Sequence, residues 1–277
     1  MGLFRTSDTG QPVNIDLLSA VVAFTFRAAP DTYIEVARHS LQGDLLVDVT
    51  GTDPHLPRGE RVMLRAAAAG IDGVPAYLSP DAVLQTHPKK TSLANLEIER
   101  VATLDLLALV ASSEASGIRI EAGRKFGKAA IDAEYVGRML SFSSNVAVKS
   151  ALSSDADFDP AATNEVRAQR RLARVIDALA ATIDDDLYFA TLQGVDEDGN
   201  AQVLNYRTTS PAPGENYLLA FTSPLEVAAR NPNDAFNAIT VRETLRLVRE
   251  DPDVAGIVLN AASPYLQLTR ADLAPLL

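Results

Sequence analysis

Ser223 stands where some enzymes hold a catalytic nucleophile, because it follows an apolar, strand-like run and precedes Pro224. A serine nucleophile needs a general base within hydrogen-bonding reach, and that base is most often histidine. Residues 141–277 contain no histidine, since the chain's three are His39, His55 and His87. A catalytic Ser223 would therefore need a base from the first half of the chain, and we predict that it is not a nucleophile.

The same residues have a structural interpretation as the start of a helix. Ser223 would be the N-cap, Pro224 the first helical residue and Glu226 the third, which forms a Ser-x-x-Glu capping box. Ser79 and Pro80 repeat this start earlier in the chain, without a glutamate at the third position. We predict Ser79, Ser223 and Glu226 to be helix-capping residues.

Three other motifs resemble ligand sites but lack essential residues. The segment GRKFGKA (123–129) has three residues between its glycines and no Ser or Thr after the lysine, unlike a phosphate-binding P-loop, so we expect a cationic strand-to-helix loop. The segment DEDGN (196–200) lacks the bidentate glutamate of a calcium loop and favours a hairpin turn. Asp184–Asp186 are expected to be solvated, and the histidines lack metal-ligand spacing. We predict no metal, no cofactor and no enzymatic activity.

One charged feature could serve a partner. Arg167, Arg170, Arg171 and Arg174 lie at helical spacings of three and four, so one side of a helix carries all of them. This arginine stripe could bind an acidic protein partner, or it could be a solvated face with ion pairs inside the chain.

The composition restricts the partners. The 277-residue chain has 25 Lys plus Arg against 36 Asp plus Glu, a net charge of −11 that disfavours nucleic acids and anionic membranes. It contains no cysteine, which fits a reducing compartment. The N-terminus turns polar after four residues and lacks the apolar core of a secretory signal. We expect a cytoplasmic protein, whose oligomeric state the sequence does not indicate.

An internal repeat indicates two domains. The segment PAYLSP (75–80) matches LAFTSP (219–224), and GIRIEAG (117–123) matches GIVLNAA (256–262), in the same order. We predict a first copy over 1–140, a Ser- and Asp-rich linker over 141–162 and a second copy over 163–277.

The periodicity predicts similar elements in each copy. Helices are expected over 15–26 and 172–183, from apolar residues on one or more faces. Strands are expected at about 44–49, 61–68 and 74–79, and at about 186–192, 201–207 and 216–222. Meander strands followed by a strand-helix-strand crossover predict an α+β fold, with a mixed sheet in each domain and helices packed mainly on one face.

These segments resemble the SseB family, named for enhanced serine sensitivity. Its pattern is an apolar strand ending in Phe-Thr-Ser, a helix, and an apolar strand ending in Asn-Pro; the chain has LLAFTSP, GIVLNAASP and a terminal LTRADLAPLL. The first copy is more divergent, and Asn260–Ala261 and Glu121–Ala122 replace the Asn-Pro turn. The resemblance implies a bacterial, cytoplasmic protein of unsettled activity and supplies no catalytic residues.

We therefore expect a non-catalytic protein that binds a protein partner as a regulatory or accessory module. The alternative is a small-molecule binder or enzyme that uses a cleft between the two copies. A histidine facing Ser223, Asp184 or Arg170 across that cleft would favour the alternative.

Overall fold

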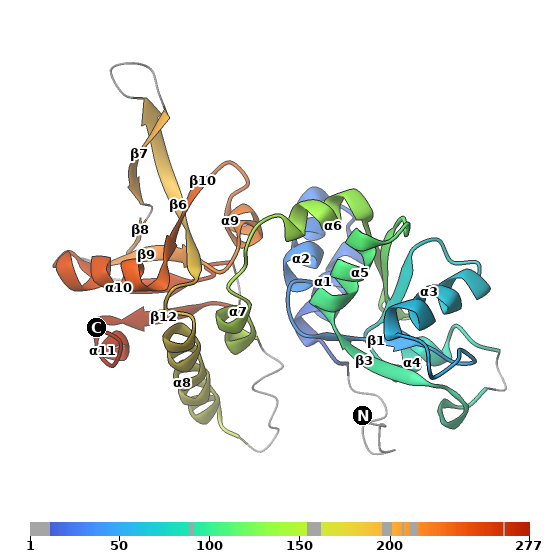
Figure 1. Ribbon diagram of the computed structural model, residues 1–277. Coiled ribbons are helices and arrows are strands. Elements are labelled where there is room, and N and C mark those ends of the chain that lie inside the picture. The colour runs from blue at the N-terminus through green and yellow to red at the C-terminus, as the bar shows by residue number, and fades with distance from the viewer. Residues whose placement is uncertain are drawn as a thin grey trace. The chain divides into compact units, whose positions relative to one another are not determined.

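The computed structural model describes residues 12–88, 91–153, 162–195, 201–206, 208–210, 215–262 and 264–277. The chain forms two compact units, which are Met1–Ser141 (unit 1) and Phe142–Leu277 (unit 2). Each unit contains one β-sheet with flanking helices (Figure 1). Within the described ranges, no helix is long and apolar enough to cross a membrane.

Unit 1 has a five-stranded sheet in the order β3-β1-β2-β4-β5. Strands β2 and β4 are parallel, and the other neighbouring pairs are antiparallel. Its elements are α1 (Ile15–Phe26), α2 (Pro30–His39), β1 (Asp44–Asp48), α3 (Arg58–Ala68), β2 (Val74–Tyr77), α4 (Pro80–Leu84), a 3-10 turn (Leu93–Asn95), β3 (Ile98–Ala102), α5 (Thr103–Ser112), β4 (Gly117–Gly123), β5 (Gly127–Asp132) and α6 (Ala133–Leu140).

Unit 2 has a central path of five strands in the order β10-β6-β9-β11-β12, with β7 paired to β6 and β8 paired to β9. Strands β9 and β11 are parallel, and their neighbours are antiparallel. Its elements are α7 (Val146–Leu152), α8 (Asn164–Ala181), β6 (Asp186–Val195), β7 (Ala201–Tyr206), β8 (Thr208–Thr209), β9 (Asn216–Phe221), α9 (Pro224–Arg230), β10 (Ala235–Thr240), α10 (Val241–Glu250), β11 (Val254–Leu259), β12 (Leu266–Thr269) and α11 (Arg270–Leu273).

The two sheets place five strands in the same order and with the same relative directions. The register gives matching positions, because Leu46 lies opposite Tyr77 in unit 1 and Tyr188 lies opposite Phe221 in unit 2. Residues of one sheet can therefore be compared position by position with residues of the other.

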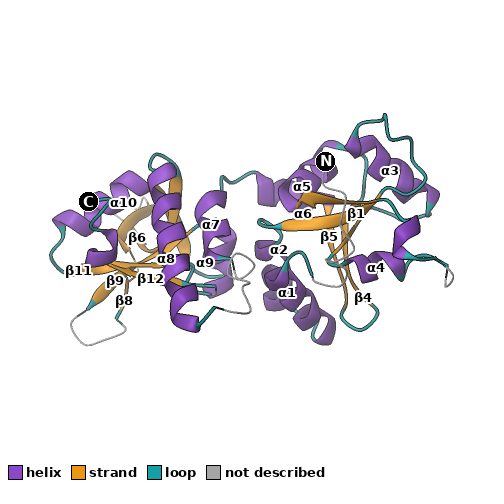
Figure 2. Ribbon diagram, turned by 90° about the horizontal axis from the view of Figure 1, so that it is seen from below, coloured by secondary structure: helices purple, strands orange, loops and turns teal. Residues whose placement is uncertain are grey.

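The helices lie mainly on one face of each sheet, which confirms the predicted α+β class (Figure 2). In unit 2 this face forms the main core, where strand residues such as Phe189 and Ile257 pack against α7, α8, α10 and α11. The opposite face is covered by α9, whose Val227 packs against Tyr188 and Phe221. In unit 1, α4 covers the corresponding face at Leu46 and Tyr77.

Two predicted elements of unit 1 were wrong. Residues 61–68 form helix α3 rather than a strand, because Val62 and Ala66 are four residues apart and are buried together. Residues 123–129 are not a strand-to-helix loop, because they hold the tight turn of the β4–β5 hairpin and the first residues of β5. Gly123 (φ 96°) and Gly127 (φ 83°), on either side of the turn, adopt the left-handed backbone that glycine favours. The predicted DEDGN turn lies outside the described residues, although β6 and β7 on either side of it pair antiparallel.

The predicted linker was wrong for residues 142–153. This segment belongs to unit 2 and includes α7, whose Val148 and Leu152 are fully buried in the core of that unit. The serines of this segment were interpreted as a linker signal, but a helix follows the N-cap Asn145. The later part of the predicted linker, residues 154–161, lies outside the described residues.

Candidate functional site

Asp48, at the end of β1, is the centre of a polar network in unit 1. Its side chain is 2% exposed, and it directly follows the buried apolar residues Leu45, Leu46 and Val47. The Oδ2 atom accepts a hydrogen bond from Arg65 Nε at 2.7 Å, and His87 Nε2 lies 2.9 Å from the same oxygen. The Oδ1 atom accepts a bond from the backbone N–H of Thr50 at 3.0 Å. Arg65 of helix α3 and His87 of the segment after α4 thus both contact one buried carboxylate.

These donors keep Asp48 ionised. Burial alone would raise the pKa of the carboxyl group, but the hydrogen bonds from Thr50, Arg65 and His87 outweigh it, so the pKa is lowered below its usual value. A lowered pKa moves the carboxyl group away from the near-neutral range that suits a general base.

The next two strands in the sheet, β2 and β4, extend the polar network across the same face. Tyr77 lies opposite Glu121, and Arg119 Nε forms an ion pair with Glu121 Oε1 at 2.8 Å. Burial raises the pKa of the Tyr77 phenol against the effect of its hydrogen bond to Thr86, and the charge of Asp48 raises it further. We call Asp48, Tyr77, Arg119 and Glu121 the polar face of unit 1.

The corresponding face of unit 2 is apolar. Asp48 lies two residues after Leu46, and the matching position in β6, two after Tyr188, is Ala190. Ala76 pairs with Ile120 as Ala220 pairs with Leu259, so Arg119 corresponds to Val258. Ala190 and Val258 are buried among aromatic and aliphatic side chains. The two units share a strand order and differ in the chemistry of this face.

Asn260 occupies the position in unit 2 that Glu121 occupies in unit 1. Within the described ranges it is the only non-glycine residue with a positive φ, at 50°. Its Oδ1 accepts a hydrogen bond from Thr222 N at 2.8 Å, and its Nδ2 donates to Thr222 Oγ1 at 2.9 Å. Asn260 therefore joins the carboxyl ends of β9 and β11, which is a structural role.

Ser223 lies at the N-cap position of α9, but the predicted capping box was wrong. Its hydroxyl is buried and has no hydrogen-bond partner, and its side chain makes no cap bond. Glu226, the other predicted member of the capping box, forms a buried ion pair with Lys149 of α7. A buried ammonium group binds a carboxylate more strongly than a neutral backbone N–H does. At the matching position of unit 1, Ser79 Oγ accepts the cap bond from Ala82 N at 3.2 Å.

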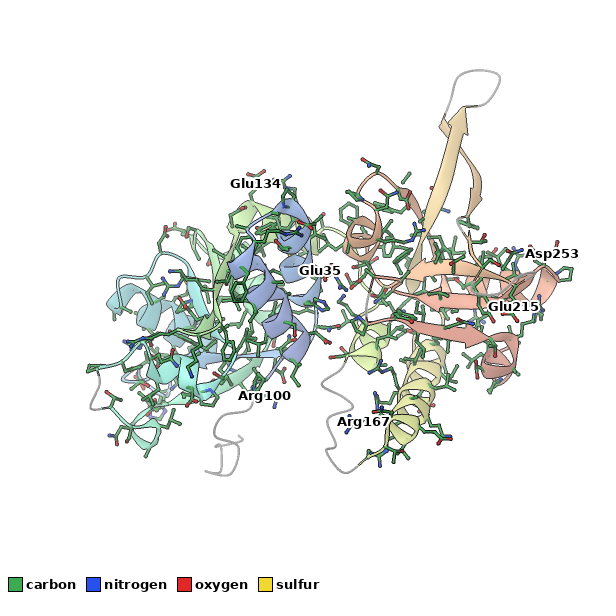
Figure 3. All side chains as sticks on the ribbon, turned by 180° about the vertical axis from the view of Figure 1, so that it is seen from behind. Glu35, Arg100, Glu134, Arg167, Glu215 and Asp253 are labelled. Carbon is green, nitrogen blue, oxygen red and sulfur yellow. The ribbon has the colours of Figure 1, made fainter. Side chains whose placement is uncertain are left out.

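The arginine stripe lies on α8, and Arg167 is labelled near the start of that helix in Figure 3. The opposite side of α8 packs into the core through Val175 and Leu179. Each of the four arginines already has an interaction within the chain, and the interpretation of the stripe as a face with internal contacts expects this. The four are Arg167, Arg170, Arg171 and Arg174.

The three histidines have different surroundings. His87 contacts Asp48, His39 is buried with its Nε2 atom 3.7 Å from Glu35 Oε2, and His55 is exposed. Within the part of the chain that the structure describes, no group of three His, Cys, Asp or Glu side chains is placed to hold a metal ion.

Sequence reasoning missed the Asp48 network and the Lys149–Glu226 pair. A usable signal for the network was present, since Asp48 interrupts an apolar run and Arg119 and Glu121 alternate with apolar residues in β4. Such alternation places the polar residues on one face of a sheet. Lys149 was missed because its segment was interpreted as a linker, in which no buried charge is expected.

Comparison with known proteins gives one match. Residues 142–274 match the family described as SseB protein N-terminal domain, which covers nearly all of unit 2. The match supports the SseB resemblance for this part of the chain, and it does not include unit 1. No curated protein and no solved structure matches the chain.

Proposed function

We propose that the protein is a non-catalytic cytoplasmic module that binds a protein partner and is built from two SseB-like domains. The observation that supports this most directly is the shared strand order of the two sheets combined with different chemistry on one face. Duplication of one domain explains the shared order, and divergence of the face explains how one copy could acquire a binding role. The match of residues 142–274 to the SseB N-terminal domain supports the domain type that this proposal assigns to unit 2.

The state of the reactive groups favours binding over catalysis. Asp48 contacts both Arg65 and His87, so its negative charge is already compensated within the chain. Ser223 is 1% exposed, which keeps its hydroxyl from an external substrate. A nucleophile must be reachable by its substrate and hydrogen-bonded to a base, and Ser223 meets neither requirement.

The proposal is tested by affinity purification of the tagged full chain from its own host, followed by mass spectrometry. Stoichiometric recovery of one protein supports the proposal. Recovery of a bound metabolite without a protein would instead support the alternative, a small-molecule binder.

The arginine stripe is tested in the same experiment. Reversal of all four arginines to glutamate should reduce partner recovery if the stripe is the contact surface, because it replaces four positive charges by four negative ones. The matched control reverses four exposed arginines elsewhere in unit 2, which are Arg230, Arg242, Arg246 and Arg249. Equal recovery with both variants would exclude the stripe as the contact surface.

A further inference from the structure

We propose that a recess beside the β4–β5 hairpin of unit 1 binds a small oxyanion, a carboxylate or a phosphate. The recess has a volume of about 240 Å³, and its polar lining residues are Gln85, Thr86, Glu121, Arg124 and Lys128. It lies between the end of α4 and the hairpin, next to the polar face. This site is independent of the protein-binding function proposed above.

The hairpin holds its backbone in a defined shape at the recess. Phe126 N donates to Gly123 O at 3.0 Å, which closes the turn. Gln85 Oε1 accepts a hydrogen bond from Arg124 N at 2.6 Å, so the carboxamide is oriented with its oxygen on the hairpin. The Nε2 group of Gln85 is then available as a donor at the rim.

The charges around the recess favour an anion. Among the described residues that line it, Glu121 is the only carboxylate, and Arg119 already pairs with this group at 2.8 Å. Arg124 and Lys128 also line the recess and are exposed, and neither forms an ion pair with another residue that the structure describes. The recess thus has an excess of positive charge in a chain of net charge −11. Ammonium and guanidinium groups bind oxyanions through charge-assisted hydrogen bonds.

The matching positions in unit 2 lack this chemistry. Ala129 pairs with Ile120 and Leu266 pairs with Leu259, so Lys128 corresponds to Tyr265. Arg119 and Glu121 correspond to Val258 and Asn260, as described above. A cation at position 128 is therefore not required by the strand arrangement, which both units form.

The experiment is a titration of the full chain with inorganic phosphate and, separately, with succinate, at constant ionic strength maintained with sodium chloride. Binding is followed by calorimetry and by backbone amide shifts of the hairpin. We expect saturable binding of at least one anion and a Kd increased about tenfold or more by Lys128→Gln, since losing a charged hydrogen bond has about that effect. The matched control is Lys125→Gln, which removes the same charge from the same hairpin at a residue that does not line the recess.

A second variant excludes a simple loss of folding. Glu121→Gln removes the carboxylate and should tighten anion binding several-fold, a gain that misfolding cannot produce. Preference for phosphate or for succinate identifies which oxyanion the recess takes. The proposal is overturned if neither anion binds saturably, or if Lys125→Gln weakens binding as much as Lys128→Gln does.

Discussion

Lys149 of α7 and Glu226 of α9 form an ion pair whose side chains are only 2% and 1% exposed. Helix α7 packs on the main core face of the unit 2 sheet, and α9 covers the opposite face. The pair therefore connects two helices that pack on opposite faces of the same sheet. In unit 1 the matching residues are apolar, because Leu18 follows the N-cap Asn14 as Lys149 follows Asn145, and Ala82 follows Ser79 as Glu226 follows Ser223.

Breaking this pair from one side should destabilise the protein strongly. Glu226→Ala removes the carboxylate that the structure shows beside this buried ammonium group and should lower the free energy of unfolding by about 3–5 kcal/mol. The double variant Lys149→Leu/Glu226→Ala reproduces the apolar residues of unit 1 and should recover most of that loss. Urea denaturation followed by circular dichroism measures both. A double variant that is less stable than Glu226→Ala would show that the ammonium group of Lys149 stabilises the protein even without Glu226, which contradicts this prediction.

The two serines before α4 and α9 should respond differently to the same substitution. Ser79→Ala removes a side-chain cap bond and should cost about 1 kcal/mol. Ser223→Ala removes a buried hydroxyl that has no partner and should cost less than about 0.5 kcal/mol, or even stabilise. Thermal or urea denaturation of the two variants provides the comparison. A loss of 1 kcal/mol or more for Ser223→Ala would indicate that its hydroxyl is hydrogen-bonded in solution.

Substitution of Asn260 should lower the stability of the protein through both its backbone conformation and its side-chain hydrogen bonds. Asn260→Ala places a β-carbon at a positive φ without the local hydrogen bonds of asparagine, and it removes two bonds to Thr222, so we expect a loss of about 2–3 kcal/mol. Asn260→Gly removes the same bonds but accepts the backbone, and should be about 1 kcal/mol more stable than the alanine variant. Equal stability of the two variants would contradict a contribution from the left-handed backbone.

Tyr33 should make the protein sensitive to alkaline pH. Burial, followed by the charge of Asp132 and the phenol of Tyr135, raises the pKa of Tyr33 from 10.0 to about 12. The folded protein therefore holds this proton more tightly than the unfolded chain, and the resulting stability is complete below pH 10 and is lost as pH rises towards 12. Tyr33→Phe should flatten the decline in unfolding free energy over this interval. An unchanged decline would assign the alkaline sensitivity to other groups.

Local signals in the sequence were sufficient to predict most of the strands. The strands β1, β2, β6, β7 and β9 lie within one or a few residues of the predicted ranges, because apolar runs between turn signals are typical of buried strands. Helix α3 was misassigned because its apolar residues, Val62, Leu64 and Ala66, also fit an alternating pattern. The contacts of α3 with β1 and β2, which no local pattern encodes, select the helical spacing.

The sequence by itself determined the α+β class, the two-part organisation and the start of α4 and α9 at Ser-Pro, because these depend on periodicity and on neighbouring residues. Only the tertiary structure decided the partners of the buried charges. Asp48 meets a side chain 39 residues away in His87, and Lys149 meets one 77 residues away in Glu226. A buried charge must find a compensating group wherever the fold brings one, so its partner depends on packing rather than on spacing along the chain.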